Sequence, residues 1–187
     1  MRILMNYITK LQYQVDVDKL VADYKTISNQ FPHDQINLTK IAGMDDNKAV
    51  TFGSGSLWND IKQQYIAHEN DWSQPIQLFT NSYTIQYVLP LLNDIASQYN
   101  CVVGRLRYLT LQPKRCLTYH IDKLDYLRLH IPVITSPGAM FIHDYQVSVM
   151  HDIGNVYLFN DKAHHTAVNA SRHPRTHLVA SIYDSSH

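Results

Sequence analysis

The spacing of hydrophobic residues differs between the first and second halves of the chain. In the first half, apolar residues recur every three or four positions, which is typical of one face of a helix. This pattern predicts a helix that is capped by Asp16 or Asp18 and runs to about Asn29, since aspartate suits the capping position. Two further helices are expected at residues 57–68 and 85–99.

Shorter extended segments and a turn connect these helices. Apolar and β-branched residues predict strands at 3–7 and 35–42. A glycine followed closely by two aspartates indicates a turn at 43–46. We therefore expect residues 1–101 to form a helical and mixed support region.

From Val102 onward the pattern changes to short runs of β-type residues with turn signals between them. The runs cover 102–111, 116–121, 126–134, 139–143, 147–150, 155–159 and 176–183. Helices followed by closely spaced strands are typical of helices packed against an antiparallel double sheet. The sequence therefore predicts a mostly β fold with N-terminal helices: a double-stranded β-helix, or jelly roll, of the cupin-like type. We expect a single domain over 1–187 with its jelly-roll core at 102–187.

Composition narrows the classes of function. A chain of 187 residues can form one domain with a substantial core. Sixteen Lys and Arg balance sixteen Asp and Glu, and this zero net charge argues against nucleic acid as a partner. Two cysteines are too few for a disulfide framework, which favours a reducing compartment, and we expect a cytoplasmic protein. The N-terminal apolar run is too short for a signal peptide and no run approaches a membrane span, so no membrane partner is expected.

The segment that begins His120-Ile121-Asp122 is the main candidate for chemistry. Residues two apart in a strand share a face, so His120 and Asp122 would project together. A second histidine from elsewhere would complete the three-ligand face of a non-haem Fe(II) site. Arg128 and His130 repeat the spacing of two, with apolar residues between them. Four polar groups converging from apolar strands are costly unless something binds there.

Each of these residues also has a structural interpretation. His120 and Asp122 can form a hydrogen-bonded pair at a polar sheet edge. Arg128 can form an ordinary ion pair with a nearby aspartate, and His130 can be a core histidine that bonds to the backbone. Three other histidines are expected at the surface or at the mouth of the site: His143, His151 and His164.

Five short motifs occur in one order along the second half of the chain. They are His120-x-Asp122, Arg128-Leu-His130-Ile-Pro132, Gly154-Asn-Val-Tyr157, His165-x-x-x-Asn169 and Arg175-Thr-His177-Leu178. In this order and spacing they resemble the aspartyl/asparaginyl β-hydroxylase branch of the Fe(II)- and 2-oxoglutarate-dependent oxygenases, which also holds bacterial proline hydroxylases. The resemblance covers residues 102–184 and leaves the first half unmatched.

The resemblance implies roles for six residues. The iron ligands that it implies are His120, Asp122 and His165. The cosubstrate contacts that it implies are Arg128 and His130, for the carboxylate beside the keto group of 2-oxoglutarate, and Arg175, for the distal carboxylate. Iron with three protein ligands keeps positions for the keto acid and for O₂. A guanidinium suits the distal carboxylate better than an ammonium does, because it donates two parallel hydrogen bonds.

Three further residues are candidate substrate contacts: Arg105, Arg107 and His164. Arg105 and Arg107 share one face of the strand at 102–111 and can reach a substrate carboxylate. His164 and His165 point to opposite faces if their segment is extended, and the spacing of the family's motifs assigns the iron to His165. His164 then lies at the rim, where it can contact substrate.

The expected function is that of a 2-oxoglutarate-dependent dioxygenase that uses Fe(II) and O₂ to hydroxylate an amino-acid side chain, free or within a peptide. An enzyme with the same cofactors can instead act on another small molecule or a nucleobase. A non-catalytic, cupin-like module that binds a metal or ligand has no need for Arg128, His130 and Arg175 together. A zinc hydrolase leaves the two arginines unexplained. The sequence leaves the oligomeric state open.

Overall fold

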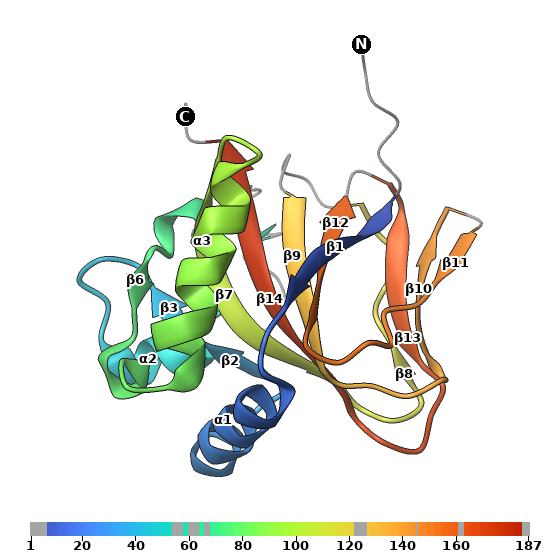
Figure 1. The fold of residues 1–187 in the computed structure, drawn as a ribbon, viewed down its shortest axis with the longest axis horizontal. Coiled ribbons are helices and arrows are strands. Elements are labelled where there is room, and N and C mark those ends of the chain that lie inside the picture. The colour runs from blue at the N-terminus through green and yellow to red at the C-terminus, as the bar shows by residue number, and fades with distance from the viewer. Residues whose placement is uncertain are drawn as a thin grey trace.

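The structure is a computed structural model, in which residues 7–53, 58–59, 64–65, 68–121, 127–144, 146–160 and 163–184 are described. Two antiparallel sheets face each other, and helices cover the outer side of the larger sheet (Figure 1). This arrangement is a double-stranded β-helix, so the predicted fold class is confirmed. No helix in the described ranges has both the length and the apolar character needed to cross a membrane.

The first half of the chain forms small elements around the larger sheet. In chain order they are β1 (Ile8–Gln14), α1 (Val17–Gln30), β2 (Gln35–Asn37), β3 (Thr39–Lys40), α2 (Asp46–Thr51), β4 (Trp58–Asn59), β5 (Gln64–Tyr65), η1 (Glu69–Asp71), β6 (Gln74–Pro75), η2 (Gln77–Phe79), η3 (Thr84–Val88) and α3 (Leu89–Ser97). η1 and η2 are short 3-10 helices, and η3 is a π-helical turn.

Two of the three expected helices are present. α1 matches the helix expected up to Asn29, and the carboxylate of Asp16 caps it by accepting a hydrogen bond from the Lys19 backbone N–H at 3.1 Å. The helix expected at 85–99 appears as η3 followed by α3. Pro90 lies in the first turn of α3, a position that tolerates the missing N–H.

The helix expected at 57–68 is wrong. Within the described part of this range, β4 pairs antiparallel with β5, and Trp58 lies opposite Tyr65. The spacing of these two aromatic residues suits two helical turns and a short hairpin equally well. Only the contact between the two strands distinguishes these structures.

Of the two strands expected in the first half, the one at 35–42 is present in two pieces, β2 and β3. Of the strand expected at 3–7, residues 3–6 lie outside the described residues, and β1 begins only at Ile8. Gly43 has the positive φ of 79° that suits the expected turn, but α2 already begins at Asp46.

The second half forms most of both sheets, as its β-type runs predicted, except that the run at 116–121 contributes only Cys116 to a strand and His120 to an isolated bridge. Its strands are β7 (Cys101–Leu111), β8 (Arg115–Cys116), β9 (Leu127–Ile134), β10 (Ala139–His143), β11 (Gln146–Ser148), β12 (Asn155–Asn160), β13 (His165–Asn169) and β14 (Arg175–Asp184). The larger sheet has six strands in the order β1-β12-β9-β14-β7-β2, and the smaller has four in the order β11-β10-β13-β8.

Alternation along the strands gives the larger sheet an apolar face and a polar face. Leu129 of β9 belongs to the hydrophobic core that the sheet shares with α1 and α3. Its neighbours Arg128 and His130 point instead toward the smaller sheet. Cross-strand register aligns Val179 of β14 with Arg107 of β7 on one side and with His130 on the other. The face toward the smaller sheet therefore carries charged and polar side chains from neighbouring strands.

Candidate active site

Two of the residues expected to bind iron are direct neighbours across an isolated antiparallel bridge between His120 and the start of β13. The backbone N–H of His120 donates to the carbonyl oxygen of His165 at 3.1 Å, and the N–H of His165 donates to the carbonyl oxygen of His120 at 2.7 Å. Residues paired in this way project their side chains from one face. The centroids of the two imidazole rings lie 4.6 Å apart. Backbone pairing thus brings both histidines to one place.

The hydrogen bonds of these two rings place the lone pair of each on Nε2. Nδ1 of His120 lies 2.5 Å from the carbonyl oxygen of Thr118, and Nδ1 of His165 lies 2.9 Å from that of Ala163. A carbonyl oxygen only accepts, so each Nδ1 carries the proton. Histidine in this tautomer binds a metal through Nε2, and a backbone carbonyl is a usual partner for the other nitrogen of a metal-binding histidine.

The third expected iron ligand, Asp122, lies outside the described residues, so its role stays a prediction. Within the described residues, no group of three His, Cys, Asp or Glu side chains is arranged to hold a metal ion. His120 and His165 therefore supply two ligands, and a three-ligand site needs one more from another part of the chain.

A pocket of about 60 Å³ lies beside the histidine pair, between the two sheets. Its polar wall residues are His120, His165, Arg128, His130 and Arg175. Phe141 and Phe159 form much of its apolar wall. The structure thus brings together all the described residues to which the resemblance assigns an iron or cosubstrate role.

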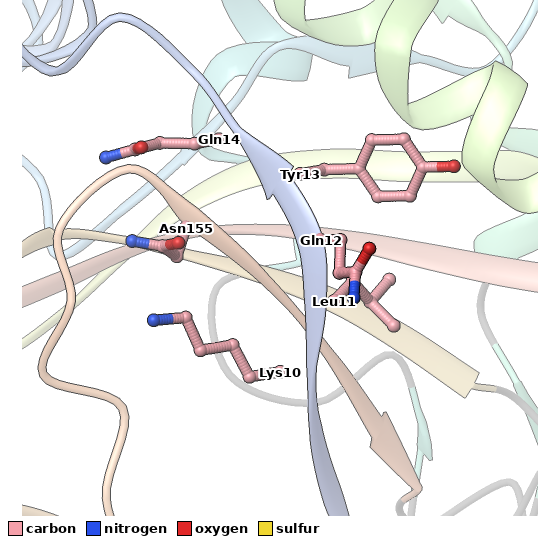
Figure 2. Close-up of a pocket in the computed structure, with 6 residues that line it drawn as sticks. All are labelled: Lys10, Leu11, Gln12, Tyr13, Gln14 and Asn155. Atoms are coloured by element: carbon pink, nitrogen blue, oxygen red, sulfur yellow. The ribbon is translucent and has the colours of Figure 1, made fainter.

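A larger hollow of about 370 Å³ lies elsewhere, at the outer edge of the larger sheet. It follows β1, where the pairing with β12 shifts register between Lys10 and Gln14 (Figure 2). Its wall consists of β1 side chains and Asn155, and none of the expected site residues lines it. The pocket between the sheets is therefore the candidate active site.

Arg175 is a buried cation on the wall of this pocket. Its Nη2 donates to Nδ1 of His177 at 3.0 Å, and its Cζ lies 4.4 Å from the centre of the Phe141 ring. Burial lowers the pKa of the guanidinium to about 9, so it stays charged at neutral pH. Among the described residues, no acidic group forms an ion pair with it. A buried charge is costly unless it is paired, and a carboxylate ligand would supply the pairing anion.

Arg128 and His130 reach the same pocket from β9. The His130 ring packs against both Phe141 and Phe159, with its Nδ1 3.3 Å from Nδ1 of His177. Arg128 lies opposite Phe159 on one neighbouring strand. Both side chains are therefore placed where a small acid in the pocket can contact them.

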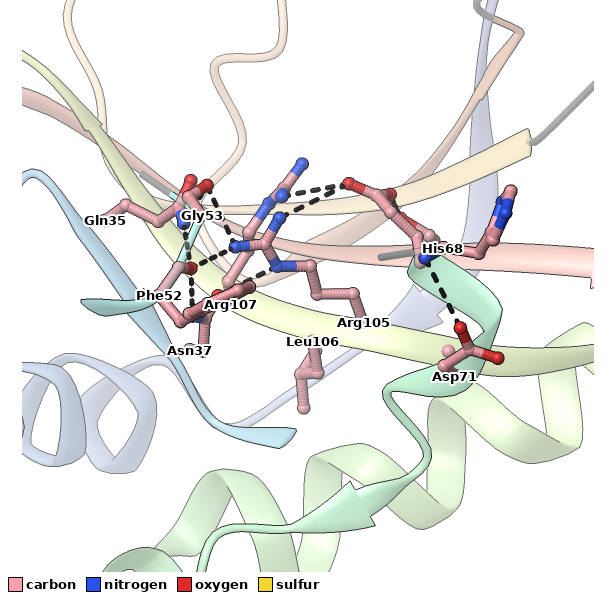
Figure 3. Close-up of polar contacts among 12 residues, drawn as sticks. Gln35, Asn37, Phe52, Gly53, His68, Asp71, Arg105, Leu106 and Arg107 are labelled. Carbon is pink, nitrogen blue, oxygen red and sulfur yellow. Dashed lines mark hydrogen bonds and ion pairs between the residues drawn. The ribbon is translucent and has the colours of Figure 1, made fainter. Parts of the chain in front are cut away.

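Arg105 and Arg107, the expected substrate contacts on β7, lie in a buried polar cluster (Figure 3). Nε of Arg105 donates to the side-chain oxygen of Asn37 at 2.9 Å, and Nη2 donates to the carbonyl oxygen of Phe52 at 2.8 Å. Nη1 of Arg107 lies 3.0 Å from Oε1 of Glu69. The contacts of Arg105 favour a structural role, and contact of either arginine with substrate stays a prediction.

Glu69 is a member of this cluster that sequence analysis did not identify. It is the chain's only glutamate, and it comes from η1 in the first half. Its backbone can approach β7 because Gly104 has no side chain: a Cβ there would collide with the Glu69 carbonyl oxygen. Burial raises the pKa of the Glu69 carboxyl, but the guanidinium groups of Arg107, Arg128 and Arg105 outweigh this and lower it to about 2. Glu69 therefore stays ionised and balances part of the buried positive charge.

Replacing Glu69 with glutamine is expected to destabilise the fold by about 3–5 kcal/mol at neutral pH, because it leaves buried guanidinium groups without their counter-charge. The parent should lose this stabilisation as pH falls from about 4.5 to about 2, since the pKa of Glu69 is lower in the folded chain than in the unfolded one. Urea unfolding of parent and variant, at neutral pH and then across this acidic range, measures both effects.

The control for this comparison is Asp94→Asn, which removes an exposed carboxylate from α3. Its free energy of unfolding should stay close to that of the parent. Equal stability of Glu69→Gln and the parent at neutral pH would contradict the structural role of Glu69.

His164 and His143 occupy contrasting positions. His164 is exposed, and its ring stacks on Tyr119 with centroids 5.7 Å apart, so its contact with substrate stays a prediction. The expectation that His143 lies at the surface or the mouth is wrong, because its side chain is buried and stacks on Tyr7 at 5.3 Å. Pairing explains this: His143 lies opposite His165 in the smaller sheet and shares its inward face.

The two facing sheets place this chain in the class of cupin-like, double-stranded β-helix proteins. Residues 22–185 match the family model of the aspartyl/asparaginyl β-hydroxylases, and the chain belongs to that family. It is therefore an enzyme of the Fe(II)- and 2-oxoglutarate-dependent hydroxylase group. The match extends well into the first half, beyond the residues that the short motifs covered. A separate comparison with curated proteins found no match.

Three solved structures resemble the chain over nearly its full length. The viral collagen prolyl hydroxylase of Paramecium bursaria Chlorella virus-1 is 8% identical, with a TM-score of 0.59 over 95% of this chain and 90% of that one. EctD from S. alaskensis, solved with 2-oxoglutarate and 5-hydroxyectoine, is 13% identical, with a TM-score of 0.58 over 96% of this chain and 73% of that one. AviO1 from Streptomyces viridochromogenes Tue57 is 14% identical, with a TM-score of 0.55 over 96% of this chain and 90% of that one. At these identities the likeness shows the fold alone.

Proposed function

We propose that the chain binds Fe(II) and 2-oxoglutarate and uses O₂ to hydroxylate an amino-acid side chain, free or within a peptide. The observation that carries this proposal is the buried guanidinium of Arg175, which lines the same pocket as the His120 and His165 pair. A ligand with a carboxylate for Arg175 and a second acid group near the metal satisfies both features. 2-Oxoglutarate has this chemistry, and family membership supports the same choice.

The metal would be held by Nε2 of His120 and Nε2 of His165, with Asp122 as the expected third ligand. Two neutral imidazoles and one carboxylate are a donor set that suits ferrous iron. When bound, the iron and its cosubstrate supply the oxidative chemistry, in which 2-oxoglutarate is decarboxylated. The protein's own part is to hold these groups in place and to limit the access of water.

The cosubstrate would be oriented from the opposite wall. Arg175 can bind the distal carboxylate through two parallel hydrogen bonds, because its guanidinium is planar. Arg128 and His130 line the pocket on β9, where they can contact the carboxylate beside the keto group. Fixing both ends of a flexible acid holds it in one reactive orientation.

The proposal is tested first by spectroscopy without O₂. Fe(II) together with 2-oxoglutarate should produce a weak visible charge-transfer band, and neither component alone should produce it. With O₂, candidate amino acids and peptides should increase succinate production, and mass spectrometry should find a product that has gained one oxygen.

The matched control is the His165→Ala protein, which should show no band under the same conditions. Failure of the metal-loaded parent to bind 2-oxoglutarate would overturn the proposed function. Binding with no oxidised product from any candidate would instead favour a non-catalytic binding module.

A further inference from the structure

His177 connects two residues of the cosubstrate wall. Nη2 of Arg175 donates to Nδ1 of His177 at 3.0 Å, and Nδ1 of His130 lies 3.3 Å from that same nitrogen. All three side chains are buried between the sheets. His177 faces the same side of β14 as Arg175, because residues two apart in a strand share a face.

The contacts of His177 assign a tautomer to both rings. A guanidinium only donates, so Nδ1 of His177 accepts and carries no proton. The single lone pair of that nitrogen is shared between the Arg175 N–H and Nδ1 of His130, so Nδ1 of His130 takes part in the contact only as a donor. Neutral His130 therefore carries its proton on Nδ1 and its lone pair on Nε2.

That lone pair lies where an acid would bind. Nε2 of His130 is buried and has no hydrogen-bond partner among the described residues, and its ring lines the pocket. A lone pair repels a carboxylate oxygen, whereas a proton on the same nitrogen would form a charge-assisted hydrogen bond. His130 as the structure places it therefore suits a carboxylate only after it gains a second proton.

The surroundings of His130 keep it neutral in the absence of an anion. Among the described residues, the charged groups that act most strongly on it are Arg175, Arg128, Arg107 and His165, and His177 contacts its ring; Glu69 pairs with Arg107 behind them. Burial, and then the positive charge of these groups, holds the pKa of His130 well below its ordinary value. A bound carboxylate favours the charged ring and raises that pKa.

We propose that His177 is a positioning residue of the cosubstrate pocket, which orients the guanidinium of Arg175 and holds the proton of His130 on Nδ1. As a result, an anionic ligand binds together with one proton, which Nε2 of His130 takes from solvent. This inference rests on the proposed function, because it takes 2-oxoglutarate as the anion. Coupled proton uptake makes binding tighter at lower pH. Affinity falls by up to about tenfold per pH unit between the pKa of His130 in the free protein and its higher pKa in the complex.

Calorimetry counts the proton directly. 2-Oxoglutarate is titrated into the Fe(II)-loaded protein without O₂, near neutral pH, in two buffers of different ionisation enthalpy. The difference in apparent binding enthalpy gives the number of protons exchanged. We expect uptake approaching one proton per ligand, with affinity that weakens as pH rises.

Two substitutions separate positioning from simple packing. H177N keeps an acceptor oxygen near the place of Nδ1, so it should retain most of the affinity and the proton uptake. H177F fills the space but removes the acceptor, so Arg175 loses its orientation and neutral His130 can carry its proton on Nε2. H177F should therefore bind 2-oxoglutarate at least tenfold more weakly and with a flatter pH dependence.

The relative 2-oxoglutarate affinities of H177N and H177F distinguish a positioning role from simple packing. A residue that only packs predicts the reverse order, with H177F close to the parent and H177N impaired, and that result would overturn the inference. Binding by the parent without proton uptake would overturn it as well, while leaving the proposed function intact. Failure of the parent to bind 2-oxoglutarate would overturn both. If H177F does not fold, the proton uptake of the parent and the 2-oxoglutarate affinity of H177N still test the inference.

Discussion

Replacing Arg175 with leucine is expected to weaken 2-oxoglutarate binding by about 2–5 kcal/mol, roughly 30-fold to several-thousand-fold, while Fe(II) affinity stays nearly unchanged. The loss arises because the distal carboxylate would be left without a partner in a buried wall. Arg175→Lys should recover only part of it, since an ammonium cannot form two parallel hydrogen bonds. Calorimetric titration of the Fe(II)-loaded variants without O₂ measures the effect.

The same substitution should not weaken the fold. Leucine removes a buried charge, although the hydrogen bond to His177 and the stacking on Phe141 are lost with it. We expect the free energy of unfolding of Arg175→Leu to equal or exceed that of the parent. Arg172→Leu, at an exposed position just before β14, is the control and should change neither binding nor stability. Parent-like cosubstrate binding by Arg175→Leu would move the anchor to another cation, with Arg107 as the next candidate.

His165→Ala is expected to reduce Fe(II) affinity by more than about 100-fold and to abolish turnover, because loss of a ligand costs more than loss of a group that supports one. His164→Ala should keep the iron and at most weaken substrate binding. The structure places His165 in the pocket wall and His164 on the exposed side. Fe(II) titration of the two variants measures the difference.

These adjacent substitutions control for each other, since both remove an imidazole from the same segment. The reverse result would shift the assignment of the metal ligand by one residue. It would also remove the spacing argument that makes Arg175 the cosubstrate anchor.

The residues that share the pocket wall were predictable from the alternation of side chains in strands. Arg128 and His130 of the wall are two apart on β9, and Arg175 of the wall is two residues from its hydrogen-bond partner His177 on β14. This alternation is a local property of an extended chain, so it can be read from consecutive residues. The assignment of iron to His165 depended in addition on the spacing of the family's motifs.

Contacts between distant parts of the chain could not be predicted in this way. Glu69 reaches the arginine cluster from a short 3-10 helix, and no periodicity in its own segment indicates the contact. His143 is buried because β10 pairs with β13, and Trp58 lies opposite Tyr65 because two short strands meet. For Glu69 and His143, the partner strand rather than the local sequence decides the environment of the side chain.

Phe141 and Phe159 come from different sheets, and each contacts a functional group of the opposite sheet. Phe141 of β10 stacks on the guanidinium of Arg175, and Phe159 of β12 packs on the ring of His165 with centroids 5.3 Å apart. The two phenylalanine rings also contact each other, at 5.2 Å. In the proposed site, this pair of rings therefore separates the histidines expected to bind iron from the arginine expected to bind the distal carboxylate. We therefore predict that the pocket selects an acid by its length, because a dicarboxylate of another length would reach one end and miss the other.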